Sequence, residues 1–455
     1  MRIPNRFGAF AFALVLALPV AGARAQNPAE FTALQGLSPV TALGNTPAGK
    51  AALAANHATT GAIQKGTARQ PLLLPFPAQQ QLALRDAFIT RGNLDQLADG
   101  LGSKLDAAYQ AVATYSSPDG GMTSRFTNVS PAVAKLITYT LATSGADADA
   151  GKYFFANATR NGTKPVSDAA KAILAGLHGV TDPFGVAYGL PAGSPGADKF
   201  GNSRPFQTVP NLLIYEGANH FGVPADNVMY LRGPMQNLVD SPSYPSGHTT
   251  YGYSGSLLLA VLVPERYEQM VVRGAEYGNN RIIIGAHYVM DVLGGRTLAL
   301  HDLAHLLANA PGYVGVERKG ETVADFPKLL AEARADMTRA LEAGCGATVV
   351  VCAGQDEGRF ADAARNAKFY AATQTYAMPV VFPKVAAAPE DVAKLAPEAG
   401  YLLTVAFPRL SLAQADAILT ETEGPGGGFL DNGSAFGVYS RLDLARAARR
   451  AAAMP

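Results

Sequence analysis

The chain has 455 residues, enough for a large hydrophobic core and for more than one folding unit. Its 37 Lys and Arg residues nearly balance its 36 Asp and Glu residues, and charged residues make up only 16% of the chain. The net charge of +1 argues against nucleic acid or an anionic membrane surface as a partner, so any functional positive charge must be local.

The first 25 residues have the pattern of a secretory signal peptide. Residues 1–6 include two arginines, residues 7–20 are an apolar run, and small residues precede a cleavage site after Ala25. A membrane anchor would need a longer apolar span, and no later stretch reaches about 18 uncharged apolar residues. We therefore expect residues 1–25 to be removed and the mature chain, without a membrane span, to be periplasmic or secreted.

An N-terminal extension and then helices are expected next. Residues 26–81 are rich in Ala, Gly, Thr, Gln and Pro with weak periodicity, so we expect an extension that wraps the core or is partly mobile. Residues 82–115 have the apolar spacing of helices. Ser130 and Pro131 suit the N-cap and first position of a helix that we expect to reach about Thr143.

The middle of the chain alternates loops and helices. Residues 166–177 predict a short helix, and the Pro- and Gly-rich residues 182–202 predict a loop that leads to Lys199 and Arg204. An apolar helix follows over residues 249–263, and Pro264 ends it. Another helix is expected over residues 265–277 and ends at Gly278.

Residues 280–296 predict a buried helix, which residues 296–308 continue or restart. On it, His287 and Asp291 would lie one turn apart on the same face. Its glycines lower helix propensity, so we expect another helix or a ligand to approach closely at Gly285, Gly294 and Gly295.

Beyond residue 310 the composition changes, and we expect an irregular C-terminal extension over residues 311–455. Within it, helices are expected over residues 322–343, 359–373, 411–419 and 440–453, and residues 380–382 and 402–407 are expected to be strand-like or buried. After export, Cys345 and Cys352 would meet an oxidising environment. A disulfide is favoured over two free thiols if the residues between them loop back, and two Cys without a nearby His argue against a metal site.

Residues able to bind an anion and transfer protons are concentrated in three segments of this weakly charged chain. They are Lys199, Arg204, Ser246, Gly247, His248, Arg281, His287 and Asp291. Arg binds phosphate-like oxyanions bidentately and Lys acts as a point charge. Backbone N–H groups at the start of the helix after Ser246 add a second anion-binding element.

The two histidines suit nucleophilic and acid–base catalysis. Asp291 can fix the tautomer of His287 and leave its other ring nitrogen basic, while His248 protonates a leaving group. Taken alone, His287 and Asp291 also fit a buried histidine capped by a carboxylate for structural reasons.

The order and spacing of these residues resemble the three-part signature of the PAP2 superfamily. The matching pieces are Lys199 with Arg204 and Pro205, then Pro245 to His248, then Arg281 with His287 and Asp291. That superfamily contains bacterial class A nonspecific acid phosphatases, membrane lipid phosphatases and vanadium-dependent haloperoxidases. The residues around the last two pieces are most similar to the soluble acid phosphatases. The resemblance covers roughly residues 82–308 and implies a mainly α fold, a helical bundle, with a catalytic domain over residues 82–310.

The resemblance also implies roles for these residues. His287 would attack phosphorus to form a phosphohistidine, Asp291 would orient His287, and His248 would protonate the leaving oxygen and then activate water. Bound phosphoryl oxygens would be held by Lys199, Arg204, Ser246, Gly247 and Arg281. The resemblance implies no metal and no other cofactor, apart from vanadate if the chain is a haloperoxidase.

Two positions depart from the family pattern. Lys199 and Arg204 enclose four residues where the family usually has six, so Lys199 is either a phosphate ligand or a solvated surface lysine. Asn280 stands where the family commonly has Ser before the arginine. Downstream, His301 and His305 have the spacing of a metal-binding pair, but a polar helix face is favoured because a third ligand is not evident.

The sequence therefore favours a secreted phosphatase acting on small-molecule phosphate monoesters. A vanadium-dependent haloperoxidase using the same oxyanion pocket is the alternative, and a non-catalytic phosphate-binding protein is a third hypothesis. The sequence leaves the substrate and any homo-oligomer open.

Overall fold

The computed structural model describes twelve ranges of the chain. These are residues 28–68, 72–87, 94–113, 129–157, 159–160, 164–165, 202–208, 217–218, 224–225, 238, 241–355 and 358–454. The predicted signal peptide, the predicted helix over residues 166–177 and Lys199 lie outside them.

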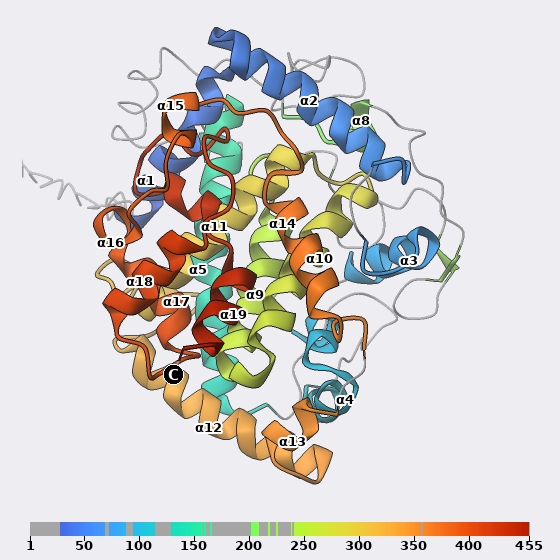
Figure 1. Ribbon diagram of the computed structural model, residues 1–455, viewed down its shortest axis with the longest axis vertical. Coiled ribbons are helices and arrows are strands. Elements are labelled where there is room, and N and C mark those ends of the chain that lie inside the picture. The colour runs from blue at the N-terminus through green and yellow to red at the C-terminus, as the bar shows by residue number, and fades with distance from the viewer. Residues whose placement is uncertain are drawn as a thin grey trace, which may run out of the picture.

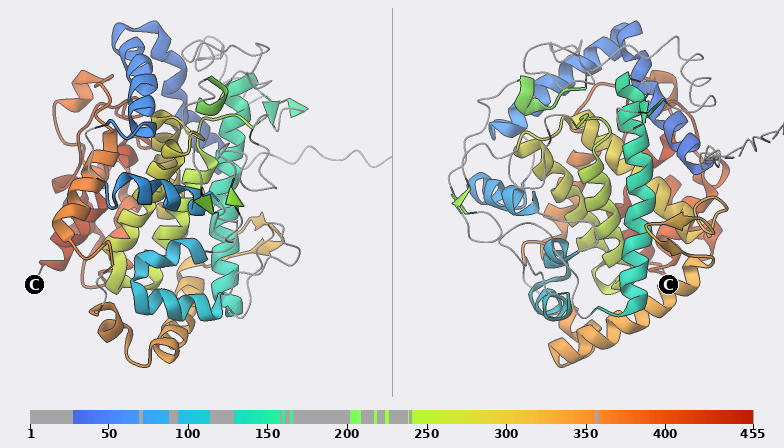
Figure 2. Two further views of the ribbon diagram at one scale, coloured as in Figure 1. Left: turned by 90° about the vertical axis from the view of Figure 1, so that its right-hand side faces the viewer. Right: turned by 180° about the vertical axis from the view of Figure 1, so that it is seen from behind.

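Four helices form the centre of the fold (Figure 1). They are α5 (Pro131–Asn157), α9 (Gly247–Leu262), α10 (Tyr267–Ile283) and α11 (Val289–Leu307). Helix α9 is buried along its length except at His248 and Tyr251, as expected of an apolar helix surrounded by others. Seen from behind, α5 extends over most of the height of the molecule, and the shorter α9 packs beside it (Figure 2). The mainly α fold predicted from the sequence is confirmed.

The helix predicted over residues 280–296 is wrong. Helix α10 continues through Gly278 and ends only at Ile283, and α11 begins at Val289. Between them Gly285 has φ +73°, a left-handed conformation that glycine adopts without strain and that ends the helical path. His287 therefore lies in the turn between two helices rather than on one helix face with Asp291.

N-terminal helices pack around the central four. They are α1 (Pro28–Leu37), η1 (Ser38–Asn45), α2 (Pro47–Gln64), α3 (Phe76–Asp86), η2 (Asp95–Leu101) and α4 (Ser103–Val112). Helix α2 lies at the end of the molecule where α11 begins (Figure 1). There Val289 N donates to Thr60 Oγ1 (3.1 Å) and Met290 N donates to Asn56 Oδ1 (2.9 Å). Because the first N–H groups of a helix have no partner within it, α2 stabilises the start of α11.

The C-terminal residues add helices to the same core. These are α12 (Phe326–Cys345), α13 (Val349–Ala353), α14 (Ala363–Thr375), α15 (Pro383–Ala386), α16 (Val392–Leu395), η5 (Pro397–Gly400), α17 (Tyr401–Thr404), α18 (Leu412–Glu421), η6 (Gly437–Arg441) and α19 (Leu444–Ala452). The four predicted helices correspond to α12, α14, α18 and α19. Residues 402–407 are buried at Leu402 and Leu403 but begin in a helix rather than a strand. One hydrophobic cluster includes residues of α9, α10, α12 and α19, so this region packs against the central helices.

The remaining elements are short. They are α8 (Pro205–Thr208), η4 (Pro264–Arg266) and three antiparallel pairs of two-residue strands, β1 (Thr159–Arg160) with β2 (Lys164–Pro165), β3 (Gly217–Ala218) with β4 (Pro224–Ala225), and β5 (Glu317–Arg318) with β6 (Glu321–Thr322).

Cys345 and Cys352 form the predicted disulfide, with Cα atoms 6.5 Å apart. Within the described ranges, none of the helices is long and apolar enough to cross a bilayer.

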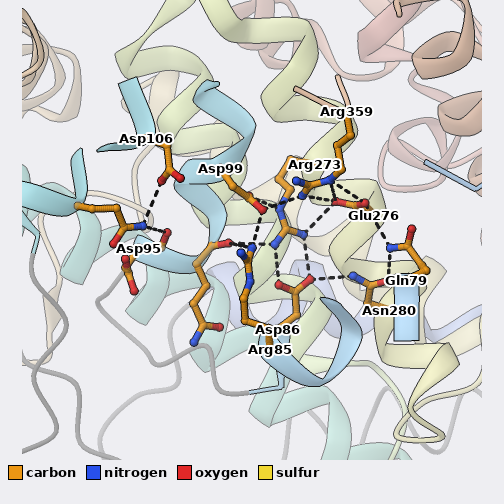
Figure 3. Close-up of polar contacts among 12 residues, drawn as sticks. Gln79, Arg85, Asp86, Asp95, Asp99, Asp106, Arg273, Glu276, Asn280 and Arg359 are labelled. Carbon is orange, nitrogen blue, oxygen red and sulfur yellow. Dashed lines mark hydrogen bonds and ion pairs between the residues drawn. The ribbon is translucent and has the colours of Figure 1, made fainter. Parts of the chain in front are cut away.

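A buried ion network fixes α10 against the N-terminal helices (Figure 3). Arg273 donates from Nη2 to Asp86 Oδ1 (2.6 Å), from Nη1 to Asp86 Oδ2 (2.9 Å) and from Nε to Asp99 Oδ1 (2.7 Å). Arg359 joins Asp99 (2.7 Å) to Glu276 (2.8 Å). Burial alone would raise the pKa of Asp99, but the guanidinium groups of Arg273 and Arg359 hold it well below its usual range.

Asn280 belongs to this network. Its Nδ2 donates to Asp86 Oδ2 (2.9 Å), and its Oδ1 accepts from Gln79 Nε2 (2.8 Å). Asn280 stands where the resembled family commonly has Ser. Its side chain bonds to α3 and so holds α10 in place at the residue before Arg281.

Candidate functional site

Three segments of the chain meet where α10 ends and α9 and α11 begin. They are residues 202–206, residues 241–246 and the turn between α10 and α11 together with the first turn of α11. Backbone hydrogen bonds join them, from Phe206 N to Gly285 O (3.2 Å), from Ser243 N to Asn202 O (2.9 Å) and from Ser246 N to Asp291 O (3.0 Å). A Cβ atom at Gly295 would lie 2.5 Å from Ser246 O, so glycine is needed for α11 to approach this closely. The close approach predicted at Gly295 is confirmed.

The imidazole of His287 is buried at the centre of this meeting point. Its Nε2 lies 3.0 Å from Arg204 Nη1 and 3.5 Å from His248 Nδ1. Its Nδ1 lies 3.5 Å from Asp291 Oδ2 and 3.4 Å from Ser243 Oγ. Because a guanidinium can only donate, this arrangement suits a tautomer with the proton on Nδ1 and the lone pair on Nε2.

Asp291 is oriented by two donors. Its Oδ2 accepts from Tyr288 N (2.7 Å) and from the hydroxyl of Ser243. Burial raises the pKa of Asp291 to about 7, although these two hydrogen bonds favour the ionised form and lower it. The Ser243 oxygen contacts both Asp291 Oδ2 and Nδ1 of His287, so the serine can link them by accepting a hydrogen bond from the Nδ1 N–H group while its hydroxyl donates to Asp291. Sequence reasoning missed Ser243, since a serine in a Pro-rich turn has no distinctive local pattern.

Arg204 is fully buried and rigidly held. It donates from Nε to Ser241 O (2.8 Å), from Nη1 to Ala286 O (2.9 Å) and from Nη2 to Pro242 O (3.2 Å). Carbonyl oxygens satisfy its N–H groups without neutralising its charge. Burial lowers the pKa of His287 well below its usual range, and Arg204 is the next largest cause. The imidazole is therefore neutral and able to act as a nucleophile.

Arg281, on the last turn of α10, is a second buried cation. Its backbone oxygen accepts from Ala286 N (3.1 Å) and His287 N (3.3 Å), which holds the turn in place. Burial lowers the pKa of Arg281, and its charge also lowers the pKa of His287. In the described part of the chain, its Nε and Nη1 have no hydrogen-bond acceptor. Buried guanidinium donors without an acceptor are suited to binding an oxyanion.

The first turn of α9 completes the arrangement. Ser246 is the N-cap, and its Oγ accepts from Thr249 N (3.0 Å). Among the described residues no acceptor is found for the Gly247 amide, which is one of the N–H groups left over at a helix start. His248 is partly exposed, so its ring can contact both the buried His287 and solvent. This turn offers an anion-binding amide beside a histidine that can exchange protons.

Of the eight residues singled out from the sequence, six lie around the seventh, His287, and Lys199 is outside the described ranges. A lysine that sequence reasoning did not consider, Lys152 of α5, reaches the same place: its Nζ lies 3.4 Å from Ser241 Oγ. By contrast, His301 and His305 pack against each other and against aromatic rings, with ring centroids 4.3 Å apart. Within the described part of the chain, no group of three possible metal ligands occurs.

Comparisons with known proteins agree with the resemblance. Residues 186–308 match the PAP2 superfamily. An acid phosphatase of Zymomonas mobilis subsp. mobilis is 38% identical over 88 residues, which are 19% of this chain and 33% of that protein. A non-specific acid phosphatase of Salmonella typhimurium is 37% identical over 95 residues, 21% of this chain and 32% of that protein. One of Providencia stuartii is 27% identical over 161 residues, 32% of this chain and 62% of that protein.

The matched parts cover about a third of the first two relatives and less than two thirds of the third. The predicted resemblance to the PAP2 superfamily and its bacterial acid phosphatases is confirmed.

Proposed function

We propose that this chain is an acid phosphatase that hydrolyses phosphate monoesters through a phosphohistidine at His287. The observation that supports it most is the environment of His287: a neutral imidazole with its Nε2 facing a guanidinium and a second imidazole. The similarity to proteins named acid phosphatase, over part of the chain, supports the same activity.

The substrate phosphoryl group binds among Arg204, Arg281 and the Gly247 amide. Two guanidinium groups can neutralise a phosphate dianion, and the start of α9 adds an N–H donor and the positive end of a helix dipole. Arg204 Nη1 donates to Nε2 of His287 (3.0 Å). Substrate oxygens compete for this donor, so binding releases the lone pair that attacks.

In the first step Nε2 of His287 forms a bond to phosphorus while the bond from phosphorus to the ester oxygen breaks. His248 gives a proton to the leaving oxygen, which departs as an alcohol. The positive charge that develops on the imidazole is stabilised by Asp291 through the Nδ1 proton, directly or through Ser243. Low pH favours this step at His248, which must be protonated to act as an acid, and opposes it at Asp291, which must be ionised to stabilise the imidazolium.

In the second step a water molecule attacks phosphorus, and His248 accepts its proton. The bond between phosphorus and Nε2 breaks, which restores neutral His287 and releases inorganic phosphate. In both transition states the charge on the phosphoryl oxygens is stabilised by Arg204, Arg281 and the Gly247 amide. The partly exposed His248 suits a group that meets alcohol and water in turn.

Hydrolysis of p-nitrophenyl phosphate at acid pH tests this function. Arg281→Met should lower kcat/KM by about 10²–10³, the typical loss of one donor to transition-state charge. Arg339→Met is the control: its side chain is 71% exposed, and turnover should stay unchanged. A purified chain without hydrolysis, or an Arg281→Met chain with full activity, would contradict the proposal.

Vanadate separates phosphatase from haloperoxidase activity, because both would bind it with the same residues. A phosphatase is inhibited by vanadate, whereas a haloperoxidase gains halide oxidation in the presence of peroxide. The named relatives favour the phosphatase.

We also propose that the chain is exported. The disulfide between Cys345 and Cys352 supports this, since such bonds persist in oxidising compartments. A mature protein recovered from the periplasm should begin at Gln26, and recovery of an intact Met1 from the cytoplasm would contradict export.

A further inference from the structure

We propose that Lys152, on α5, is a phosphate-binding residue of this site and provides the ammonium group that the sequence assigned to Lys199. This inference rests on the proposed function, because it names a further residue for the same phosphoryl group. No sequence motif includes Lys152, and the helix predicted from Ser130 was expected to end near residue 143. Helix α5 instead continues to Asn157, which brings Lys152 to the site.

The position of Lys152 is the first argument. The residue is 6% exposed, and its Nζ lies 3.4 Å from Ser241 Oγ. A Cβ atom at Gly247 would also be 3.4 Å from Nζ, so the ammonium group lies beside the first residue of α9. The same place offers the Gly247 amide and the start of a helix dipole, which both favour an anion.

The second argument is that Lys152 and Arg204 share an acceptor. Arg204 Nη2 donates to Ser241 Oγ (3.1 Å), the same oxygen that accepts from Lys152. The two cationic side chains therefore converge on one hydroxyl oxygen at the edge of the site. A phosphate dianion bound beside that oxygen would lie within reach of donors from both side chains.

The charge of Lys152 also acts on two other residues of the site. The charge of Lys152 lowers the pKa of both His287 and Asp291, together with larger causes of which burial comes first. A cation that acts on the nucleophile and on its orienting carboxylate is close enough to act on a phosphoryl group bound at Nε2 of His287. Lysine is suited to this contact as a point charge with three donors, whereas Arg204 contributes a planar fork.

Binding of inorganic phosphate to the full chain tests the assignment without requiring turnover. Lys152→Gln keeps a donor toward Ser241 but removes the charge, so we expect calorimetry to show phosphate affinity reduced at least tenfold. The phosphate-induced rise in melting temperature should shrink in parallel. Lys152→Arg restores the charge and should recover most of the affinity, which a purely structural lysine would not predict.

Lys135→Met is the matched control on the same helix. Its side chain is 37% exposed and pairs with Glu321, so phosphate affinity should stay within twofold of the unmodified chain. Lys199→Met tests the competing residue and should have a similarly small effect. The assignment would be overturned if Lys152→Gln left phosphate affinity unchanged. It would also be overturned if Lys199→Met lowered phosphate affinity tenfold and Lys152→Gln did not. If the unmodified chain binds phosphate but does not hydrolyse p-nitrophenyl phosphate, the proposed function fails while these binding data still decide on Lys152.

Discussion

Replacing Arg273 with methionine removes the guanidinium at the centre of the buried network. Asp86 is fully buried and, among the described residues, its carboxylate would keep only the hydrogen bond from Asn280 Nδ2. Glu276 and Asp99 would still pair with Arg359. The variant therefore removes the ion-pair partner of one buried carboxylate.

Breaking a buried ion pair in this way costs about 3–5 kcal/mol. That is a large part of the roughly 5–15 kcal/mol by which native proteins are stable. For a chain of this length the unfolding entropy is large, so we expect the melting temperature to fall by only about 3–6 °C. Adding Asp86→Asn removes the uncompensated charge and should recover at least half of the loss, because the two residues are in contact and their effects are not additive.

Far-UV circular dichroism is the suitable assay, because the chain is rich in helix and contains no Trp. Arg339→Met, which breaks an exposed pair with Asp336, is the control and should change stability by less than about 1 kcal/mol. An Arg273→Met variant as stable as this control, or a double variant less stable than the single one, would refute the argument.

Two further predictions concern Asp291. Its pKa of about 7 lies above its unfolded value, so its contribution to stability is full at low pH and is lost as pH rises toward 7. In phosphate-free buffer, Asp291→Asn should therefore have a higher melting temperature than the unmodified chain at pH 8 and the same melting temperature at pH 4. Its kcat should fall by about 10²–10⁴. Equal melting temperatures at pH 8 would contradict the burial argument. Ser243→Ala removes a hydrogen bond that lowers the pKa of Asp291, so the acid limb of kcat against pH should move to higher pH. Ser243→Thr keeps the hydroxyl and should leave this limb in place, whereas identical profiles for all three proteins would show that the serine does not act on Asp291.

The residues predicted from the sequence to form the site share a chemical character that is rare in this chain. Arg204, His248 and Arg281 could be grouped because cations and histidines are concentrated there, and the structure places them around His287. Ser243 and Lys152 could not be found in this way. A serine and a lysine are common in loops and on helix surfaces, and only tertiary packing makes these two buried neighbours of the site.

Local signals also explain which helices could be predicted. Ser411 and Gln414 form a capping box at the start of α18, and Pro131 starts α5 after its N-cap Ser130. The same rules placed the end of α10 too early, at Gly278. That glycine is buried and packs against Val292 of α11, so tertiary contacts override its low helix propensity.

The central claim is that His287 is transiently phosphorylated, and rapid quenching of a His248→Ala chain tests it most directly. p-Nitrophenolate leaves without needing a proton, whereas water attack needs His248, so phosphoenzyme should accumulate in this variant. We predict phosphate on Nε2 of His287 by peptide mapping, and none when His287→Ala is added. Continued turnover without any phosphorylated protein, or phosphate on another residue, would contradict the account.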